Sequence, residues 1–458
     1  MKVALVQCPQ WDLELPPLGI AYLSSYIKKN DYKVKIFDFN IDLFHEVGEK
    51  YKKYWEVGFD FDIFWREREK MEELNLINKS ILDMWLEKIM KFEPDVIGFS
   101  VLVNTKLVSL ILAEKIKEIN PDIKIIFGGQ ECLKDRSGFE IVNKNFIDVV
   151  VQGEGEYTLN EVINKMKNNE EIEKVSGILM KKNDKVIDNG TSIVIKNLDQ
   201  IPFPDFGMFN LEKYLRSNAL PLLMSRGCVN RCVYCSERIF WQQYRCRSAE
   251  NVFEEMKHNI KRFNRRVFFF NDSLINGNLK ELEKLCDFII ESGLETVWNG
   301  NAIIRKDMSL KLLQKMKKAG CDGLIYGIES ASEKILRKMG RNYNIKDAER
   351  VIKDTAKVGI VPATNWILGF PGETNIDFIK TIWFLIKNRN YLKVTQPGGS
   401  PFVVLASTDI YKNCKDYDIV PGLNGPDWRS VDGKNTRELR EKRAKMFRNI
   451  ARMLRMID

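Results

Sequence analysis

Histidine, long apolar runs and linker-like tracts are the scarce features of this sequence. Only His45 and His258 occur among its 458 residues. No segment approaches the ~18 consecutive apolar residues that a membrane-spanning helix needs. The opening MKVALVQCPQ has the pattern of a strand and lacks the charged and apolar regions of a secretory signal. We therefore expect no transmembrane segment and a location in the cytoplasm.

The composition is that of an ordinary globular protein, with 44% hydrophobic and 29% charged residues. A chain of this length exceeds one ordinary core, so two or three domains are expected. The net charge is +9, and residues 431–458 supply five of these charges. Because the excess is concentrated in this tail, it does not indicate a nucleic-acid-binding surface.

The nine cysteines are not spaced as a disulfide framework, and their number is odd. Three of them form a C-x3-C-x2-C triplet, Cys228, Cys232 and Cys235. A short apolar strand, Pro221–Ser225, precedes the triplet, and Gly227 frees the backbone to turn into a loop. Three thiolates on one loop can hold three irons of a [4Fe–4S] cluster and leave the fourth iron open to another ligand.

A structural zinc site is the alternative interpretation of this loop. Zinc takes four tetrahedral nitrogen or sulfur ligands, and Cys246 could supply the fourth. However, zinc sites usually pair their cysteines two by two, and both histidines lie outside the loop. The spacing therefore favours the iron–sulfur cluster.

Residues 1–195 alternate strands with helices, which predicts a doubly wound parallel sheet. The expected strands are Val3–Val6, Val34–Phe39, Asp95–Val101, Ile123–Phe127 and Asp148–Val151. Ligands of such sheets bind at the carboxyl ends of the strands. The residues that close these strands here are Ser100, Leu102, Gly128, Gly129, Gly153 and Glu154.

Residues 217–410 repeat a strand–helix unit about six times, as in a partial barrel. The expected strands after the cysteine loop are Arg266–Phe270, Glu295–Asn299, Gly323–Gly327 and Pro362–Leu368. In a barrel of this kind the chemistry lies at the carboxyl ends of the strands. The candidate residues at or after those ends are Asn271, Asp272, Arg305, Glu329, Ser330, Gly369, Pro371 and Gly372.

The ordered set of motifs resembles the radical SAM enzymes that carry an N-terminal cobalamin-binding domain. The resemblance implies that the three cysteines bind a [4Fe–4S] cluster and that S-adenosylmethionine (SAM) chelates its fourth iron. It also implies SAM contacts: Tyr234, Gly369, Pro371 and Gly372 at the adenine, Glu329 and Ser330 at the ribose, and Asn271, Asp272 and Arg305 at the methionine end.

The first domain has an S-x-L…GG pattern that resembles the one which, in cobalamin-binding domains, makes room for the nucleotide tail of the cofactor: Ser100, Leu102, Gly128 and Gly129. The turn at Gly153–Glu154 also looks like that of the same family. A sheet of this shape that binds no corrinoid is the alternative. The family's cobalt-ligating D-x-H-x-x-G motif is not matched. His45 lies one residue off that pattern and after the second strand, so we expect it to be an ordinary helix residue.

These expectations define a four-part chain: a Rossmann-like cobalamin-binding domain at 1–195, a linker with Pro202 and Pro204 at 196–216, a radical SAM partial barrel at 217–410 and a helical extension at 411–458. The aromatic residues within 45–93 are expected to form a local core, with a lid over the substrate or corrinoid as the alternative: Tyr51, Tyr54, Trp55, Phe59, Phe61, Phe64 and Trp65. In the extension, an apolar stripe is expected to dock on the barrel: Leu439, Met446, Ile450, Met453 and Ile457. Binding of its basic face to an anionic membrane or an acidic substrate is the alternative.

The function that follows is methylation of an unactivated carbon by way of a 5′-deoxyadenosyl radical and methylcobalamin. No residue is required as a general base, so no catalytic residue is assigned. Two alternatives stay open: ring formation or rearrangement with the same cofactors, and a metal- or cluster-binding protein without turnover. The expected partners are an electron donor such as flavodoxin or ferredoxin and a substrate that is a small molecule, lipid or peptide, with no nucleic acid.

Overall fold

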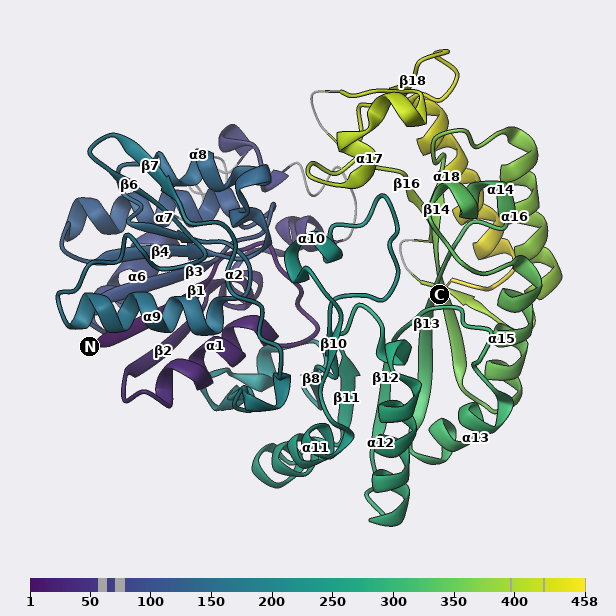
Figure 1. Cartoon of the computed structure of the whole chain (residues 1–458), viewed down its shortest axis with the longest axis horizontal. Coiled ribbons are helices and arrows are strands. Elements are labelled where there is room, and N and C mark those ends of the chain that lie inside the picture. The colour runs from purple at the N-terminus through teal and green to yellow at the C-terminus, as the bar shows by residue number, and fades with distance from the viewer. Residues whose placement is uncertain (57–63, 71–78, 396–397, 423–424, 458) are drawn as a thin grey trace. The chain divides into compact units, whose positions relative to one another are not determined.

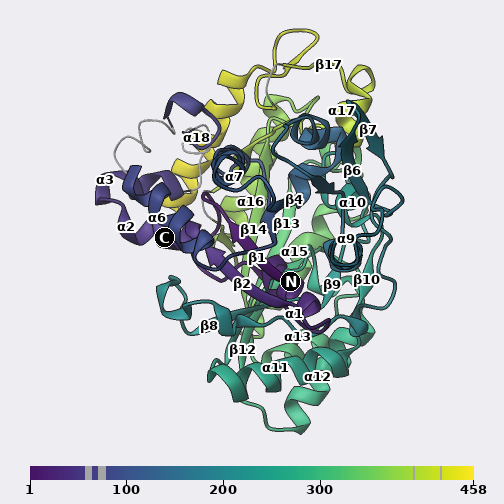
Figure 2. The ribbon, with the colours of Figure 1, turned by 90° about the vertical axis from the view of Figure 1, so that its left-hand side faces the viewer.

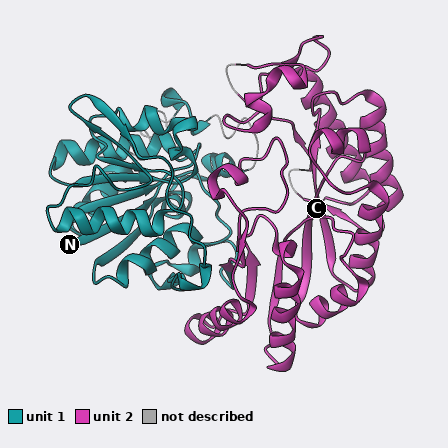
Figure 3. Ribbon diagram, viewed as in Figure 1, with its two compact units in different colours: residues 1–220 teal, residues 221–458 magenta. Residues whose placement is uncertain are grey.

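The computed structural model describes residues 1–56, 64–70, 79–395, 398–422 and 425–457. The chain divides into two compact units, Met1–Leu220 and Pro221–Asp458 (Figure 3). None of the described helices is long and apolar enough to cross a membrane.

The first unit is built on a seven-stranded sheet in the order β2-β1-β3-β4-β5-β6-β7. Its parallel strands are β1 (Lys2–Gln7), β2 (Lys33–Asp38), β3 (Val96–Ser100), β4 (Lys124–Gly128) and β5 (Val149–Val151). The antiparallel hairpin β6 (Ile178–Lys182) and β7 (Lys185–Asp188) extends it at one edge. The strand order reverses between β1 and β3, which is where doubly wound sheets form their ligand crevice.

Helices cover both faces of this sheet. They are α1 (Leu18–Lys28), α2 (Phe39–Glu46), α3 (Glu49–Lys52), α6 (Lys79–Met90), α7 (Lys106–Ile119), α8 (Phe139–Val142) and α9 (Gly155–Lys167). Successive strand residues serve opposite faces: Ala4 and Val6 join one apolar core, Val3 and Leu5 the other. Burial on both faces explains why these strands are continuous apolar runs.

The described part of the aromatic segment forms a local core, as expected. Tyr51, Trp55, Phe64 and Trp65 are buried in the core beneath α2 and α6. The Tyr54 and Phe64 rings stack with centroids 3.8 Å apart. Phe59 and Phe61 lie outside the described residues.

The second unit is built on a sheet in the order β15-β14-β13-β12-β11-β8, with β16 (Ser400–Pro401) paired to β14. The strands are β8 (Ala219–Leu222), β11 (Val267–Phe270), β12 (Val297–Ala302), β13 (Cys321–Glu329), β14 (Val361–Leu368) and β15 (Lys393–Val394). The pairs from β11 to β15 are parallel. Two short antiparallel pairs, β9 (Ser225–Arg226) with β10 (Arg245–Cys246) and β17 (Ile419–Val420) with β18 (Arg429–Ser430), complete the strands.

Helices follow the strands in regular alternation and lie along one side of the sheet (Figure 1). They are α11 (Ala249–Phe263), α12 (Leu279–Glu291), α13 (Leu310–Lys318), α15 (Ile345–Lys357) and α16 (Asn375–Asn388). The unit also has three shorter helices, α10 (Glu237–Trp241), α14 (Glu333–Lys338) and α17 (Asp409–Lys412), and α10 and α17 lie apart from this row. The expected fold class, a doubly wound sheet followed by a partial βα barrel and a helical end, is confirmed.

The last helix, α18 (Arg437–Met453), corrects one expectation. Its buried residues are Arg440, Arg443, Ala444, Phe447 and Ala451. Met446 and Met453, which belong to the stripe expected to dock, are 46% and 84% exposed. The helix therefore docks with a face that contains two arginines, and part of the predicted apolar stripe faces solvent.

Candidate functional site

The cysteine loop lies between β9 and α10, and all three thiols are half-buried. Gly227 enters the loop at φ 78°, where an added Cβ would lie 2.5 Å from the Gln243 carbonyl oxygen. Further along, the Val233 N–H donates to the Met339 carbonyl oxygen (3.2 Å), and Gly340 at φ 80° lets the backbone after α14 approach the loop. The loop is thus fixed both at its entry and from the segment that follows α14.

The strand segment that leads into the loop is fastened by Asp272. Its carboxylate accepts hydrogen bonds from the N–H of Met224 (3.0 Å), the N–H of Ser225 and the Ser225 hydroxyl (2.6 Å). Asp272 is 1% exposed, and burial raises its pKa to about 7. Because its carboxylate oxygens are already bound to Met224 and Ser225, Asp272 does not fit the expected contact with the methionine end of SAM. The preceding residue, Asn271, is instead exposed at the end of β11.

A buried charged group joins the cysteine loop to the end of β13. Arg341 donates to the Tyr234 hydroxyl (2.9 Å) and forms an ion pair with Glu329. Glu329 has φ 66°, and burial raises its pKa against the opposing effect of Arg341. A side chain at Gly327 would lie 2.6 Å from Glu329 Oε1, so this glycine makes room for the pair.

Arg341 also acts on the loop itself. Burial raises the pKa of Cys232, and the guanidinium of Arg341 opposes that rise, which favours the thiolate. The sequence analysis did not identify Arg341, because it lies twelve residues after Glu329 in a segment with no motif.

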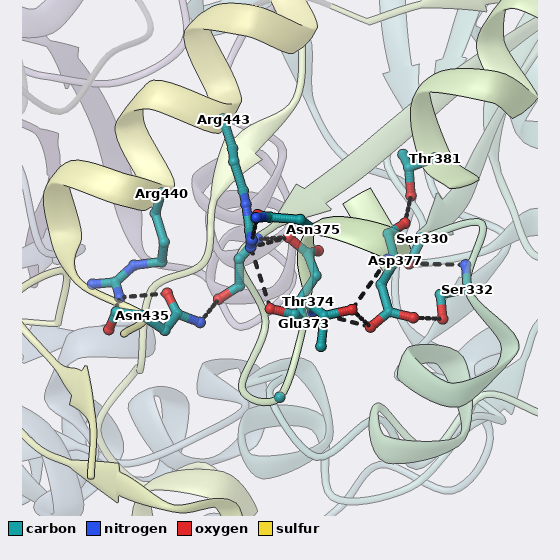
Figure 4. Close-up of polar contacts among 12 residues, drawn as sticks. Ser330, Ser332, Glu373, Thr374, Asn375, Asp377, Thr381, Asn435, Arg440 and Arg443 are labelled. Carbon is teal, nitrogen blue, oxygen red and sulfur yellow. Dashed lines mark hydrogen bonds and ion pairs between the residues drawn. The ribbon is translucent and has the colours of Figure 1, made fainter. Parts of the chain in front are cut away.

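Ser330 is held in the junction between β13 and the start of α16. Its hydroxyl accepts from the Ser332 N–H (3.2 Å), and the Ser332 hydroxyl donates to Asp377 Oδ1 (2.6 Å). Asp377 also accepts from the Thr374 hydroxyl (2.7 Å). These bonds, drawn in Figure 4, tie the end of β13 to the residues that follow β14.

The turn G-F-P-G-E-T after β14, residues 369–374, is bonded to side chains of α18 and of the segment just before it (Figure 4). Gly369 donates its N–H to Glu373 Oε1 (3.0 Å) and accepts at its carbonyl from Asn435 (2.9 Å). Arg443 pairs with Glu373 Oε1 at 2.7 Å, with side chains 6% and 1% exposed. A Cβ on Gly369, which has φ 74°, would lie 2.3 Å from Arg440 Cγ.

The rest of this turn also packs closely. Pro371 is buried, and Gly372 has φ 81° with Lys338 Nζ 2.7 Å from the place of a Cβ. Gly369 is therefore required by its positive φ and by the buried Arg440 beside it, whereas Gly372 is required by its positive φ, since the Lys338 ammonium could move away.

Arg305 does not fit its expected role. Its Nε and one terminal nitrogen donate to the carboxylate of Asp307 (2.8 and 2.6 Å), and the other terminal nitrogen donates to the carbonyls of Asn276 and Gly277 (3.1 and 3.0 Å). The guanidinium thus stabilises the loop after β11 and has acceptors within the protein.

In the first unit the candidate residues gather where β3 and β4 end. Ser100 and Gly128 are register partners. A Cβ on Gly129, at φ 116°, would lie 2.5 Å from the Val101 carbonyl oxygen, whereas a Cβ on Gly128 would meet only Val151 Cβ at 3.7 Å. Gly129 is therefore required by the backbone itself, and Gly128 leaves open space at the strand ends.

The neighbouring candidates have internal contacts. The Leu102 N–H donates to the Thr105 hydroxyl (2.8 Å). Gly153 has φ 98°, and the buried Glu154 accepts from the Ile195 N–H (3.1 Å). His45 lies on α2, and its Nε2 is 2.7 Å from the Lys213 carbonyl oxygen, in agreement with the expectation of an ordinary helix residue.

A polar bridge that the sequence analysis missed crosses the β1–β3 switch point. Asn104, after β3, donates to Gln10 Oε1 after β1 (2.8 Å) and accepts from Arg66 Nε (2.9 Å). Such a bridge lies where doubly wound sheets bind ligands. Each residue is unremarkable in the sequence, and only the strand order brings the three together.

Within the described residues no group of three or more histidine, cysteine or acidic side chains is arranged to hold a metal ion. This holds for a zinc site and for a cluster alike, so it does not decide between the two.

Two family models match the two units. The model described as "Radical SAM superfamily" matches residues 222–385, and the one described as "B12 binding domain" matches residues 71–163. The chain is a member of the radical SAM superfamily. More narrowly, it is one of the radical SAM enzymes that carry a cobalamin-binding domain, and the expected cofactors (a [4Fe–4S] cluster, SAM and cobalamin) are those of the two matched domains.

Curated relatives cover most of the chain. An "Uncharacterized methyltransferase PH0819" of Pyrococcus horikoshii is 27% identical over 81% of this chain and 73% of its own length. An "Anaerobic magnesium-protoporphyrin IX monomethyl ester cyclase" of Rubrivivax gelatinosus is 26% identical over 78% of this chain and 60% of its own length.

A solved structure has a similar fold. It is the radical S-adenosylmethionine methyltransferase TsrM of Kitasatospora setae with cobalamin and a [4Fe–4S] cluster bound, with a TM-score of 0.69 and 16% identity over 92% of this chain and 76% of that chain.

The role assigned to Asp272 predicts a sharp contrast between two adjacent substitutions. In Asp272→Asn the amide NH2 would face a backbone N–H, so we expect the free energy of unfolding to fall by about 1–3 kcal/mol. Asn271→Asp, the reverse change at the exposed neighbour, should alter it by less than about 0.5 kcal/mol. Urea unfolding measures both, and equal effects would contradict the fastening role.

The Arg443–Glu373 pair predicts a rescue. Arg443→Met leaves the Glu373 carboxylate buried without its cation, so the free energy of unfolding of the second unit should fall by about 3–5 kcal/mol. Adding Glu373→Gln removes the buried charge and should restore much of that loss. Thermal unfolding of the single and double variants tests this, and additive losses would show that the two side chains do not interact.

Proposed function

We propose that the protein is a cobalamin-dependent radical SAM methyltransferase that acts on an unactivated carbon. The observation that carries the proposal is the combination, in one chain, of a three-cysteine loop set in a βα barrel and a doubly wound sheet with an open glycine at its strand ends. Each unit supplies a place for one of the two cofactor systems that such a reaction needs.

The cysteine loop fits a cluster with one open iron. Cys228, Cys232 and Cys235 are half-buried on a braced loop, and a buried cation, Arg341, stands near Cys232. Burial raises the pKa of all three thiols, so coordination to iron would be what holds them as thiolates, and Arg341 opposes the rise at Cys232. We assign the three cysteines as the metal ligands of the protein.

The strand ends around this loop form the proposed SAM site. Tyr234, fixed by Arg341, and the turn of Gly369, Pro371 and Gly372 are assigned to the adenine. Glu329 and Ser330 are assigned to the ribose, and the exposed Asn271 to the methionine end. Asp272 and Arg305 support neighbouring backbone and are not assigned a ligand contact.

The first unit fits a corrinoid by the space at its strand ends. An added Cβ on Gly128 would have no neighbour closer than 3.7 Å, and Gly128 lies opposite Ser100 in the β3–β4 pair. We assign Ser100, Leu102, Gly128 and Gly129 to the nucleotide tail of cobalamin, and the turn of Gly153 and Glu154 to the wall of the same site.

When bound, the cluster supplies the electron that cleaves SAM, and methylated cobalamin supplies the methyl group. The chain's own residues bind and orient. Glu329 and Arg341 are already paired in the protein, so the ribose would meet a carboxylate whose position is fixed. No side chain in this group needs to act as a general base, so the residues serve binding and positioning.

Ring formation is the second candidate, and the cyclase of Rubrivivax gelatinosus, at 26% identity, is the observation that favours it. An electron donor such as flavodoxin or ferredoxin, a substrate other than a nucleic acid and a cytoplasmic location belong to the proposal as well. They follow from the chemistry and from the charge distribution of the sequence.

The cluster and the reaction are tested together. Anaerobically reconstituted protein should bind about four irons and four sulfides, and with a reductant and cobalamin it should consume SAM and form methylated cobalamin. A Cys228→Ala/Cys232→Ala/Cys235→Ala variant should lose the iron and all SAM cleavage, whereas Cys246→Ala should keep both. Stoichiometric zinc without iron would contradict the assignment, and SAM cleavage without methyl transfer to cobalamin or product would favour ring formation.

The cobalamin site is tested at Gly128. Gly128→Trp should abolish cobalamin binding, because the indole would fill the space at the strand ends, whereas Gly128→Ala should fold and bind normally. Absorbance of the protein after gel filtration with cobalamin measures binding. His45→Ala should leave the cobalt spectrum unchanged, since His45 contacts Lys213. Normal binding by Gly128→Trp would place the corrinoid elsewhere.

A further inference from the structure

Helix α16 carries an apolar stripe on its outer face. Ile376, Ile379 and Trp383 are 67%, 62% and 64% exposed. They are spaced three, four and seven residues apart, so they lie on one face of the helix. Two other barrel helices, α12 and α15, have only charged residues among their exposed positions: Lys280, Lys284, Glu291, Lys346 and Lys357.

The same face of α16 is positively charged. Lys380 and Lys387 are its exposed charged residues, and exposed Arg389 follows the helix. The one carboxylate of α16, Asp377, is 3% exposed and is bound to Ser332 and Thr374. The outer face of this helix thus combines apolar side chains with cations, of which Lys387 is paired with Glu349 of α15 (2.9 Å).

Helix α18 continues the stripe. The two helices pack against each other and lie side by side in both ribbon views (Figures 1 and 2). Arg443 marks the side of α18 that faces α16, because it contacts Asn375 (2.8 Å) and the Phe378 ring. Met446 follows Arg443 by three residues and Met453 follows Met446 by seven, so the two exposed methionines lie on the flank of α18 next to Arg443.

Cations flank this part of the stripe as well. Lys442, Lys445 and Arg452 are exposed on α18. Its acidic residues, Glu438 and Glu441, lie near the start of the helix, and Glu441 is paired with Arg437 (2.7 Å). We call the combined region the α16–α18 surface: Ile376, Ile379, Trp383, Met446 and Met453 with Lys380, Lys387, Lys442, Lys445 and Arg452.

We propose that the α16–α18 surface binds the face of an anionic lipid bilayer. Apolar side chains beside lysines and arginines match an interface with buried acyl chains and negative headgroups, and a tryptophan is favoured at that depth. Symmetric pairing with a second copy of this chain would bring two cationic faces together, which disfavours it. The attachment is peripheral, and it stands independently of the reaction proposed above.

The test is flotation of the full chain with vesicles. The protein should float with vesicles of equal parts phosphatidylglycerol and phosphatidylcholine, and remain at the bottom with phosphatidylcholine alone. Raising the salt concentration should weaken the binding, because headgroup attraction is screened. Failure to float with the anionic vesicles at low salt would overturn the proposal.

Matched variants distinguish vesicle binding by the α16–α18 surface from non-specific binding of the basic protein to vesicles. Lys380→Glu/Lys387→Glu should lower the bound fraction by about tenfold or more, and Ile379→Gln/Trp383→Gln should do so as well. The controls are Lys311→Glu/Lys318→Glu, on the exposed positions of α13, and Ile119→Gln/Ile193→Gln, at 55% and 65% exposed positions of the first unit. Both controls should float like the unchanged protein.

Two further outcomes would overturn the proposal. If the controls lost binding as strongly as the α16–α18 variants, the attraction would be a property of the whole basic protein. If sedimentation showed a dimer that Ile379→Gln/Trp383→Gln abolished, and the unchanged protein did not float, the surface would belong to a contact between copies.

Discussion

The position of the three thiols depends on one buried carboxylate. Asp272 follows β11, yet its oxygens accept three hydrogen bonds from Met224 and Ser225, which lie just before the cysteine loop. A carboxylate is stable at 1% exposure only because these donors replace water. The entry to the loop is therefore fixed by the neighbouring strand, and the loop inherits the rigidity of the sheet.

The other strand ends of the second unit are held in a related way, by arginine–carboxylate pairs withdrawn from water. Arg341 with Glu329 supports the end of β13, and Arg443 with Glu373 supports the turn after β14. Buried pairs of this kind contribute little net stability, because desolvation offsets their attraction. Their value lies in geometry, since each pair holds a backbone segment in one position for a ligand to meet.

The sequence allowed the elements and the ligand-bearing loop to be predicted, because both rest on local patterns. Apolar runs closed by glycine located the strands, and the cysteine spacing located the loop. Arg341 and Arg443 could not be found in this way, since their partners lie twelve and seventy residues distant. Periodicity alone predicts that the apolar stripe on α18 is buried, because it shows that the helix has two faces without showing which of them is covered. The face of α18 that is buried carries Arg440 and Arg443, which bind buried groups of the second unit, and part of the apolar stripe stays exposed to solvent.

The bonds that hold the turn after β14 affect the order in which this part of the protein can fold. Gly369 and Glu373 leave the ribosome well before Arg443 and Asn435, which complete their hydrogen bonds. The last helix belongs to the same compact unit as the turn, and a domain folds as a unit. The turn therefore reaches its supported form only after the last helix has been synthesised and has docked.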